Sequence, residues 1–513
     1  MSNDAGSRCR SRQSTAVRNS IGRIAGNAAS LLTSDVVNKA ATFIVYALVG
    51  RYLGTTEFAQ MSLALSLFYT FGVFAGAGLK TLITREVATD STKTDQYLVN
   101  GSIVVIVCSL LSIGGLLLLV RLMNYSADAA TFIVLLGLGL PPLSLSSVCQ
   151  GIFQAREQMH YIAYANALAN VAKVGLAFLI LANGYGLYPL VILLVASHLL
   201  VAGVMWWLMI RHITRPRARI DFGFCWRMIK SSSTFLGIEG VIGIWASLNI
   251  LLLSKLATEV EVGLYSAASQ LIGPVTLVLA SMALSLFPIM CRRSETSVEG
   301  PRAISQSLIE LMLSIAIPVA VGLCFLGDSA LLLIYKKEEF ALASGALQIM
   351  VWSLIPIALD HVLGQVLLAT LLEKVTLRIV VIDVLVNLVL GLLLVRRFGL
   401  NGAAMAALLT RIIDFIQHYV PVSKMMPRMA LGRAAWKPIV ASACMAVLLA
   451  TVRSLGTALT VVSGGALYVG VLFALTVWSA GGLRQFKSKC LYLSGQGAWN
   501  PSGQEMSEMP NAE

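Results

Sequence analysis

The fold of this chain is decided by an apolar stretch near its N-terminus, ALVGRYLGTTEFAQMSLALSLFYTFGVFAGAGLKTLITREVA at residues 47–88. Within it, residues 57–79 form a run in which Glu57 is the single charged residue. A helix of about 20 such residues crosses the hydrocarbon core of a bilayer. Arg51 precedes this run, and Lys80 and Arg85 follow it. The stretch therefore predicts a membrane-spanning helix between two polar segments.

The composition extends this prediction to the whole chain. Of 513 residues, 57% are hydrophobic and 12% are charged, and the mean hydropathy is +0.80. An ordinary globular domain is about 45–50% apolar and about 25% charged, so a soluble protein is excluded, and disorder requires low hydrophobicity. We therefore predict an all-α polytopic membrane protein. The candidate spans are fourteen apolar ranges: 28–49, 57–79, 97–120, 129–149, 162–182, 187–210, 232–254, 263–288, 304–326, 342–369, 379–395, 400–423, 438–452 and 458–479.

Basic residues are unequally distributed between the two sides of these spans. With the N-terminus in the cytoplasm, 27 of the 38 Lys and Arg lie in cytoplasmic segments, 8 in outer loops and 3 within spans. The positive-inside rule describes this asymmetry, so we expect both termini in the cytoplasm. The richest loop, 211–231, is interpreted first as a topological anchor, with attraction of anionic lipid or substrate headgroups as the alternative.

Motifs for catalysis and for metal binding are missing from the sequence. It contains no Gly-x-x-x-x-Gly-Lys-Ser/Thr loop and no His-Glu-x-x-His, and the longest outer loop, about 327–341, is too short for a catalytic domain. None of the cysteines lies in an outer loop or pairs with histidine at zinc spacing, so neither disulfides nor a metal site are expected. The +13 net charge follows mainly from topology, and nucleic acid is not an expected partner. These observations favour a transporter without its own ATPase over an enzyme.

A weak internal repeat indicates two related halves. RYLGTTEFAQMSLA from residue 51 aligns with KLATEVEVGLYSAA from residue 255. NGYGLYP at 183–189 aligns with RRFGLNG at 396–402, each at a predicted turn between two spans. The offsets of 204 and 213 fit one duplication with a small insertion. The predicted organisation is a basic tail at 1–27, six-helix lobes at 28–210 and 232–423 joined by a linker at 211–231, two further helices at 424–479 and a tail at 480–513.

Ionisable residues within the predicted spans are candidates for function, because a charge inside a bilayer is costly. The candidates among them are Asp35, Lys39, Lys173, Glu239, Asp360, His361, Asp383, Arg411 and Asp414. Polar residues recur in spans one, seven, ten, eleven and twelve, which predicts a polar cavity between two bundles with apolar helices facing lipid. The pairs Asp35–Lys39 and Arg411–Asp414 have the spacing of ion pairs within a helix, so a structural role stays open for them. Lys173 has no local partner and is predicted to face an anionic group.

The opening stretch is similar to the first two helices of bacterial polysaccharide flippases. In that family the first helix ends in an arginine and Tyr-Leu-Gly, a turn with Glu-Phe or Glu-Tyr follows, and the second helix ends in Gly-Leu before an Arg-Glu pair. The matching residues here are Arg51, Tyr52, Leu53, Gly54, Glu57, Phe58, Gly78, Leu79, Arg85 and Glu86. VNLVLGLLLVRRFGLNGAAMAALLTR at 386–411 also resembles the family's eleventh and twelfth helices.

The resemblance implies the multidrug/oligosaccharidyl-lipid/polysaccharide exporter superfamily, with two six-helix lobes, a central cavity and alternating access. It implies a flippase of the bacterial cytoplasmic membrane that moves a polyprenyl-diphosphate-linked oligosaccharide for exopolysaccharide or O-antigen synthesis, with a polysaccharide polymerase and a chain-length regulator as further partners. The residues expected to contact the phosphates and headgroup are Lys39, Arg85, Lys173 and Arg411. The residues expected to couple transport to H⁺ or Na⁺, or to balance charge, are Asp35, Glu239, Asp360, His361, Asp383 and Asp414. No cofactor is expected.

Three alternatives to this function stay open. A multidrug extruder of the same superfamily is disfavoured, because a cavity for organic cations should be acidic. A flippase for lipid-linked peptidoglycan precursor is a closer rival that the sequence separates poorly. A membrane polysaccharide polymerase is disfavoured by the absence of a long outer loop.

Overall fold

The computed structural model describes Ser30 and residues 33–217, 219–294, 299–370, 372–425, 430–451 and 457–479, and within these ranges it has helices and no strand. An N-terminal helix at residues 33–52 comes first. The elements that follow are α2 (Thr55–Gly76), α3 (Leu79–Thr89), η1 (Ser91–Lys93), α4 (Thr94–Met123), α5 (Ala127–Gly137), α6 (Leu140–Ala155), α7 (His160–Ala182), α8 (Leu187–His212), α9 (Phe222–Leu256), α10 (Glu259–Ser294), α11 (Glu299–Tyr335), η2 (Glu338–Ala343), α12 (Ser344–Met350), η3 (Val351–Ser353), α13 (Leu354–Ala369), α14 (Glu373–Met425), α15 (Leu431–Thr451) and α16 (Thr457–Ser479).

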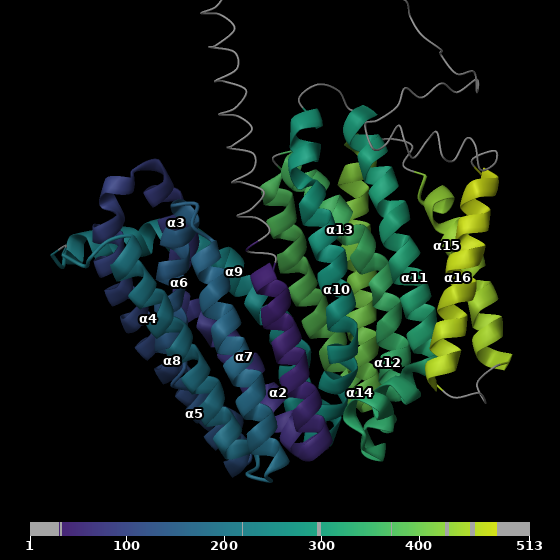
Figure 1. Ribbon diagram of the computed structural model, residues 1–513, viewed down its shortest axis with the longest axis horizontal. Coiled ribbons are helices and arrows are strands. Elements are labelled where there is room, and N and C mark those ends of the chain that lie inside the picture. The colour runs from purple at the N-terminus through teal and green to yellow at the C-terminus, as the bar shows by residue number, and fades with distance from the viewer. Residues whose placement is uncertain are drawn as a thin grey trace, which may run out of the picture.

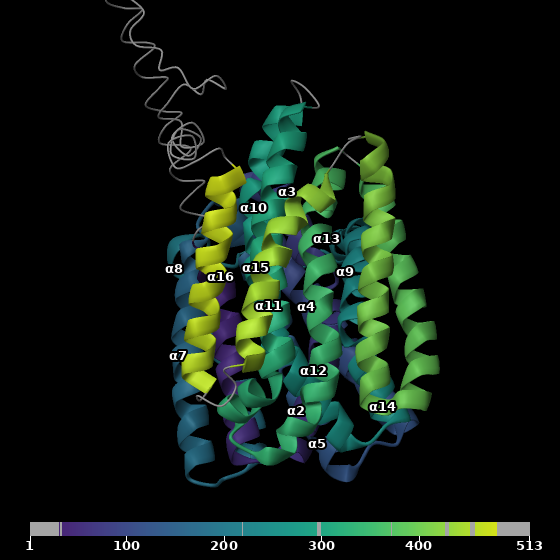
Figure 2. The same cartoon turned by 90° about the vertical axis from the view of Figure 1, so that its right-hand side faces the viewer.

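The helices form two bundles that lie side by side (Figure 1). In one bundle α2 packs against α4, α5 and α6, and α7 packs against α8. In the other, α13 packs against α11 and α14. Contacts of α2 with α9 and α10, and of α9 with α14, join the two bundles. The predicted all-α membrane fold is confirmed, and α15 and α16 form an outer layer beside α11 (Figure 2).

Twelve stretches of the described chain are long and apolar enough to cross a membrane. They do not include the N-terminal helix at 33–52, and the predicted spans 379–395 and 400–423 fall together in the single stretch Val375–Met425. A count of fourteen spans therefore stays a prediction. The hydropathy of Ser91–Met123 is the highest of all, and α4 exposes Leu111 and Leu122 at 71% and 70%, as expected of a helix that faces lipid.

The helix α14 doubles back on itself at Gly399, whose φ of 53° and ψ of −128° are not helical. Asn387 donates to the Thr410 hydroxyl at 3.1 Å, and Gln417 donates to the Asp383 carboxylate at 2.8 Å. In a straight helix these pairs would lie roughly 35 and 50 Å apart, at 1.5 Å per residue. The two arms of α14 are therefore antiparallel neighbours, and the turn predicted at residues 396–402 is confirmed.

The internal repeat is visible in the positions of the helix starts. The helix α2 begins at Thr55 and α10 begins at Glu259, so the two starts differ by the 204 positions of the sequence alignment. The second alignment pairs Gly186 with Gly399, and both glycines have positive φ, 78° and 53°, immediately before a leucine that continues in a helix. Glycine adopts this conformation without steric penalty, which explains why both turns carry one.

Candidate functional site

A cavity of about 1280 Å³ lies where the N-terminal helix, α6, α7, α8 and α10 face one another. Its polar lining consists of Ser34, Asp35, Asn38, Lys39, Thr42, Tyr69, Lys80, Ser146, Gln150, Gln154, Asn166, Asn170, Lys173, Ser197, His198, Gln270, Thr276 and Ser281. Because α10 belongs to the second half of the chain, both bundles contribute to this cavity. The predicted polar cavity between two bundles thus has a counterpart in the structure.

Three lysines and one carboxylate are the charged groups in this lining: Lys39, Lys80, Lys173 and Asp35. None of these lysines belongs to an ion pair in the part of the chain that the structure describes. The carboxylates of Asp35 and Glu239 act electrostatically on Lys80, and Lys173 acts on His198. The three lysines therefore outnumber these two carboxylates, and the cavity carries a small excess of positive charge.

Two hydrogen bonds fix the N-terminal helix against α7. Asn166 donates to the Ser34 hydroxyl at 2.8 Å, and Asn170 donates to the side-chain oxygen of Asn38. Both pairs repeat at i,i+4, which places each set on one face of its helix. Asp35 and Lys39 each follow a bonded residue by one position, so their side chains point to the adjacent face and into the cavity.

Lys80 is a cavity residue that the sequence interpretation assigned to a loop. The chain leaves α2 through Ala77 and Gly78, with φ of 51° and 64°, and enters α3 at once. The span consequently continues to Thr89, and Lys80 lies inside it. The paired glycines Gly76 and Gly78 in an otherwise apolar helix were the available signal for such a kink.

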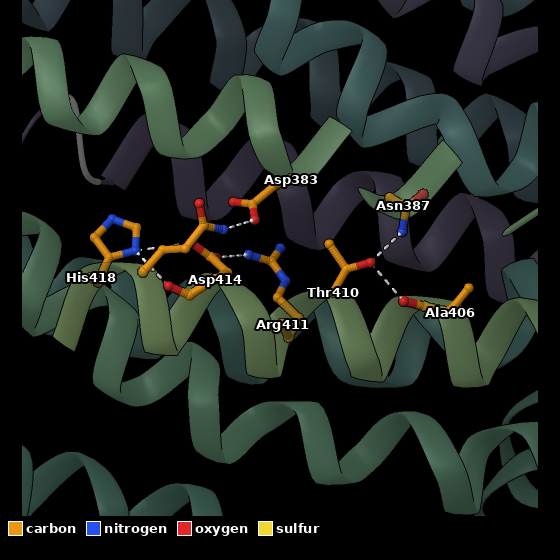
Figure 3. A network of polar contacts seen from close by, with 8 residues as sticks. Asp383, Asn387, Ala406, Thr410, Arg411, Asp414 and His418 are labelled. Atoms are coloured by element: carbon orange, nitrogen blue, oxygen red, sulfur yellow. Dashed lines mark hydrogen bonds and ion pairs between the residues drawn. The ribbon is translucent and has the colours of Figure 1, made fainter. Parts of the chain in front are cut away.

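A second polar cluster lies between the two arms of α14 (Figure 3). Arg411 pairs with Asp414 at 3.3 Å, which confirms the ion pair expected from their spacing. The other oxygen of Asp414 is 2.9 Å from Nδ1 of His418. The guanidinium of Arg411 also lies 4.1 Å from the ring centroid of Trp245 on α9. Stacking on an aromatic face, together with a carboxylate, accommodates an arginine inside a membrane.

Asp360 is the unsatisfied member of this cluster. Within the described part of the chain, neither of its carboxylate oxygens has a hydrogen-bond partner, although both are buried. One of them lies within 4.8 Å of ligand atoms on Asp414 and His418. Two ionised carboxylates at this separation repel each other unless a proton or a cation lies between them. The cluster can therefore take up a positive charge.

The remaining predicted residues lie around these two groups. The side chain of Arg85 is 60% exposed, pairs with Glu86 at 2.9 Å and is not in the cavity lining. Glu239 accepts from Thr81 at 3.2 Å on the neighbouring α3. His361 follows Asp360 on α13 and is within electrostatic range of Arg411, Asp414 and Lys39. No ion pair joins Asp35 to Lys39 among the described contacts; each lines the cavity instead.

An apolar groove of about 600 Å³ lies between α11, α13 and α15. It is lined by residues such as Leu313, Phe325, Trp352, Leu359 and Ile439. Trp352 and Ile439 are 40% and 53% exposed, so the groove is open at the side of the second bundle.

Comparisons with known proteins agree with this geometry. The family model described as polysaccharide biosynthesis protein matches residues 24–294, and the MatE family model matches residues 243–393. The probable low-salt glycan biosynthesis flippase Agl15 of Haloferax volcanii is 22% identical over 465 residues, which cover 89% of this chain and 95% of that protein.

Solved structures show the same fold. A structure of the lipid II flippase MurJ in an inward closed conformation superposes with a TM-score of 0.71 at 14% identity, covering 86% of this chain and 98% of that one. An inward-facing multidrug resistance MATE transporter of the MOP superfamily superposes with a TM-score of 0.62 at 13% identity, covering 77% and 98%. At these identities the structures establish the fold.

Proposed function

The chain belongs to the polysaccharide biosynthesis protein family, and from this premise we propose that it moves a polyprenyl-diphosphate-linked oligosaccharide across the membrane. The observation that carries the proposal is the set of cavity lysines Lys39, Lys80 and Lys173, which lack ion-pair partners among the described residues. Uncompensated charges inside a membrane protein are costly, so they are retained where a ligand supplies the opposite charge. A diphosphate is such a ligand.

The rest of the cavity suits the glycan. Gln150, Gln154, Asn166 and Gln270 present amide groups, which donate and accept hydrogen bonds as sugar hydroxyls require. The polyprenyl chain needs no polar partner and can remain in the bilayer. The cavity volume of about 1280 Å³ exceeds the roughly 300–1,000 Å³ of ordinary ligand pockets, which fits an oligosaccharide.

We assign the second cluster to ion coupling. The described cluster holds three carboxylates, Asp360, Asp383 and Asp414, and one arginine, Arg411. Neither carboxylate oxygen of Asp360 accepts a hydrogen bond from a described residue. Binding of H⁺ or Na⁺ there would change the electrostatic environment of His361, on which the cavity residue Lys39 also acts electrostatically. Asp360→Asn removes the charge while keeping the shape, so it should abolish the dependence of transport on an ion gradient and leave substrate binding intact. Unchanged ion dependence in Asp360→Asn contradicts this assignment.

If the termini lie in the cytoplasm, as the distribution of basic residues predicts, the end of the bundles at which α3 lies faces the cytoplasm. The two bundles come closest together at the opposite end, where α2 begins (Figure 1). Because biosynthetic intermediates are loaded from the cytoplasmic side, we expect the substrate to enter at the α3 end.

Proteoliposomes test the transport function directly. Purified protein is reconstituted with a fluorescent polyprenyl-diphosphate oligosaccharide, and translocation is followed by loss of the label to an impermeant quencher. Lys173→Gln should reduce translocation strongly, whereas Lys424→Gln, an exposed lysine at the end of α14, should not. Equal rates in protein-free vesicles contradict the proposal.

A peptidoglycan-precursor flippase is the second candidate, because the same three lysines would also bind the diphosphate of that lipid. Gene deletion tests the glycan function against the alternatives. Loss of a surface or secreted polysaccharide, with the lipid-linked repeat unit retained at the cytoplasmic face, supports the glycan function. Unchanged polysaccharide with increased drug sensitivity would instead support a multidrug extruder.

A further inference from the structure

The linker between α8 and α9 carries a concentration of basic side chains that lies apart from the transport cavity. The exposed basic residues of this region are Arg211, Arg215, Arg217, Arg219, Arg227 and Lys230. A hollow of about 370 Å³ is lined by Arg211, His212, Thr214, Arg215, Arg217 and Asp95, together with two isoleucines.

The backbone of the linker is held in place on α4. The amide of Arg217 donates to both oxygens of the Asp95 carboxylate, at 3.0 and 3.2 Å. The amide of Asp221 donates to the side-chain oxygen of Asn100 at 2.9 Å. The carboxylate of Asp95, which lines the hollow, is thus bonded to the backbone of Arg217. The guanidinium of Arg217 takes no part in these bonds and is free to contact a ligand.

The charge of the linker is largely uncompensated. Its one ion pair between described residues is Arg227–Asp221, with N and O 3.8 Å apart. Arg211, Arg215 and Arg217 have no carboxylate within ion-pair distance in the described chain. Three guanidinium groups around one hollow suit a phosphate, which accepts bidentate hydrogen bonds from arginine.

Exposed apolar side chains follow these arginines in the sequence. Phe222, Trp226 and Ile220 are 79%, 69% and 57% exposed. Phe222 and Trp226 are i,i+4 in the first turns of α9, so they share one face. Aromatic rings at the ends of membrane helices lie at headgroup depth, where basic residues meet lipid phosphates.

We propose that this hollow binds the phosphate of an anionic phospholipid of the surrounding bilayer, with Phe222 and Trp226 against its acyl chains. Arginines together with exposed aromatic rings favour a phospholipid over free inorganic phosphate, because inorganic phosphate has no apolar part that such rings could contact. A topological anchor alone requires positive charge and predicts no bound lipid. The site is independent of the transport function proposed above.

Native mass spectrometry of the full-length protein in detergent tests the proposal, with phosphatidylglycerol as probe and phosphatidylcholine as the zwitterionic comparison. Arg215→Gln/Arg217→Gln should weaken phosphatidylglycerol binding about 30-fold, since each basic residue near a membrane surface contributes about fivefold. Arg396→Gln/Arg397→Gln removes two exposed arginines from the opposite end of the second bundle and should leave it unchanged. Arg215→Lys/Arg217→Lys should retain most of the binding, which separates loss of charge from misfolding.

Phe222→Ser/Trp226→Ser should weaken phosphatidylglycerol binding and leave binding of inorganic phosphate as it is in the unmodified protein. The proposal is overturned if Arg215→Gln/Arg217→Gln binds phosphatidylglycerol like the unmodified protein. It is equally overturned if Arg396→Gln/Arg397→Gln weakens this binding as much as Arg215→Gln/Arg217→Gln does. It is also overturned if phosphatidylcholine binds as well, if millimolar inorganic phosphate displaces the lipid, or if polyprenyl diphosphate displaces it at equal concentration.

Discussion

The carboxylate of Glu339 accepts hydrogen bonds from both the amide and the hydroxyl of Thr55, each at 3.1 Å, across 284 positions of sequence. This contact joins the start of α2 to the turn η2 and therefore holds the two halves of the chain together at one end. Lys337 donates to the carbonyl of Leu53 at 2.9 Å, and Arg51 donates to the carbonyl of Ile334 at 2.6 Å. The arginine and Tyr-Leu-Gly turn of the sequence pattern is thus part of a latch, which we define as these four contacts.

Removing Glu339 should loosen the latch. In Glu339→Ala the amide and hydroxyl of Thr55 lose a charged acceptor, a change of about 1.5–3 kcal/mol per bond when buried and less at this exposed position. Hydrogen–deuterium exchange should become faster in residues 50–58 and 334–340. Glu338→Ala is the matched control, because the adjacent Glu338 is exposed and makes no such contact in the described structure. Equal exchange in both variants would show that the latch does not hold this end closed.

Gly78 should tolerate no side chain. A Cβ at this position would lie 2.6 Å from the amide nitrogen of Leu236 and 2.9 Å from the carbonyl oxygen of Ser232, both in the backbone of α9. Its φ of 64° adds the penalty of a left-handed conformation, so Gly78→Ala should cost about 2–5 kcal/mol from strain and overpacking together. Thermal unfolding in detergent should show a large loss of stability for Gly78→Ala and a small loss for Gly76→Ala. The Cβ of Gly76→Ala would lie 4.0 Å from the Ser147 hydroxyl oxygen, which is ordinary contact.

The asparagine pair between the N-terminal helix and α7 should be energetically coupled. Asn170→Ala leaves the side chain of Asn38 without its partner in a partly buried site, which costs about 1–3 kcal/mol. The double variant Asn38→Ala/Asn170→Ala should cost less than the sum of the single variants, because no partner is then left unpaired. Additive effects in a double-mutant cycle of thermal unfolding would mean that the two side chains act independently.

The sequence predicted the apolar spans and the turn at Gly399, since both depend on local composition and on glycine at a positive φ. It also predicted the Arg411–Asp414 pair, because three residues separate neighbours on one helical face. The same spacing left a direct Asp35–Lys39 pair open, and in the described structure no such ion pair forms and both side chains line the cavity. The helix face that meets the cavity is set by partners far away in sequence, such as Asn170. Local spacing within the helix cannot predict these partners.

A comparison of Lys80 with Arg85 tests whether transport requires a basic residue inside the cavity or only basic charge at this end of the bundle. Both lie on α3, five residues apart, but Lys80 lines the cavity whereas Arg85 is 60% exposed and paired with Glu86. A charge-assisted hydrogen bond to phosphate is worth about 1.5–3 kcal/mol, so Lys80→Gln should reduce translocation about 10- to 100-fold. Arg85→Gln removes the same charge from outside the cavity and should keep at least half of the rate in the same proteoliposome assay. If Arg85→Gln is the more damaging variant, the substrate headgroup binds outside this cavity.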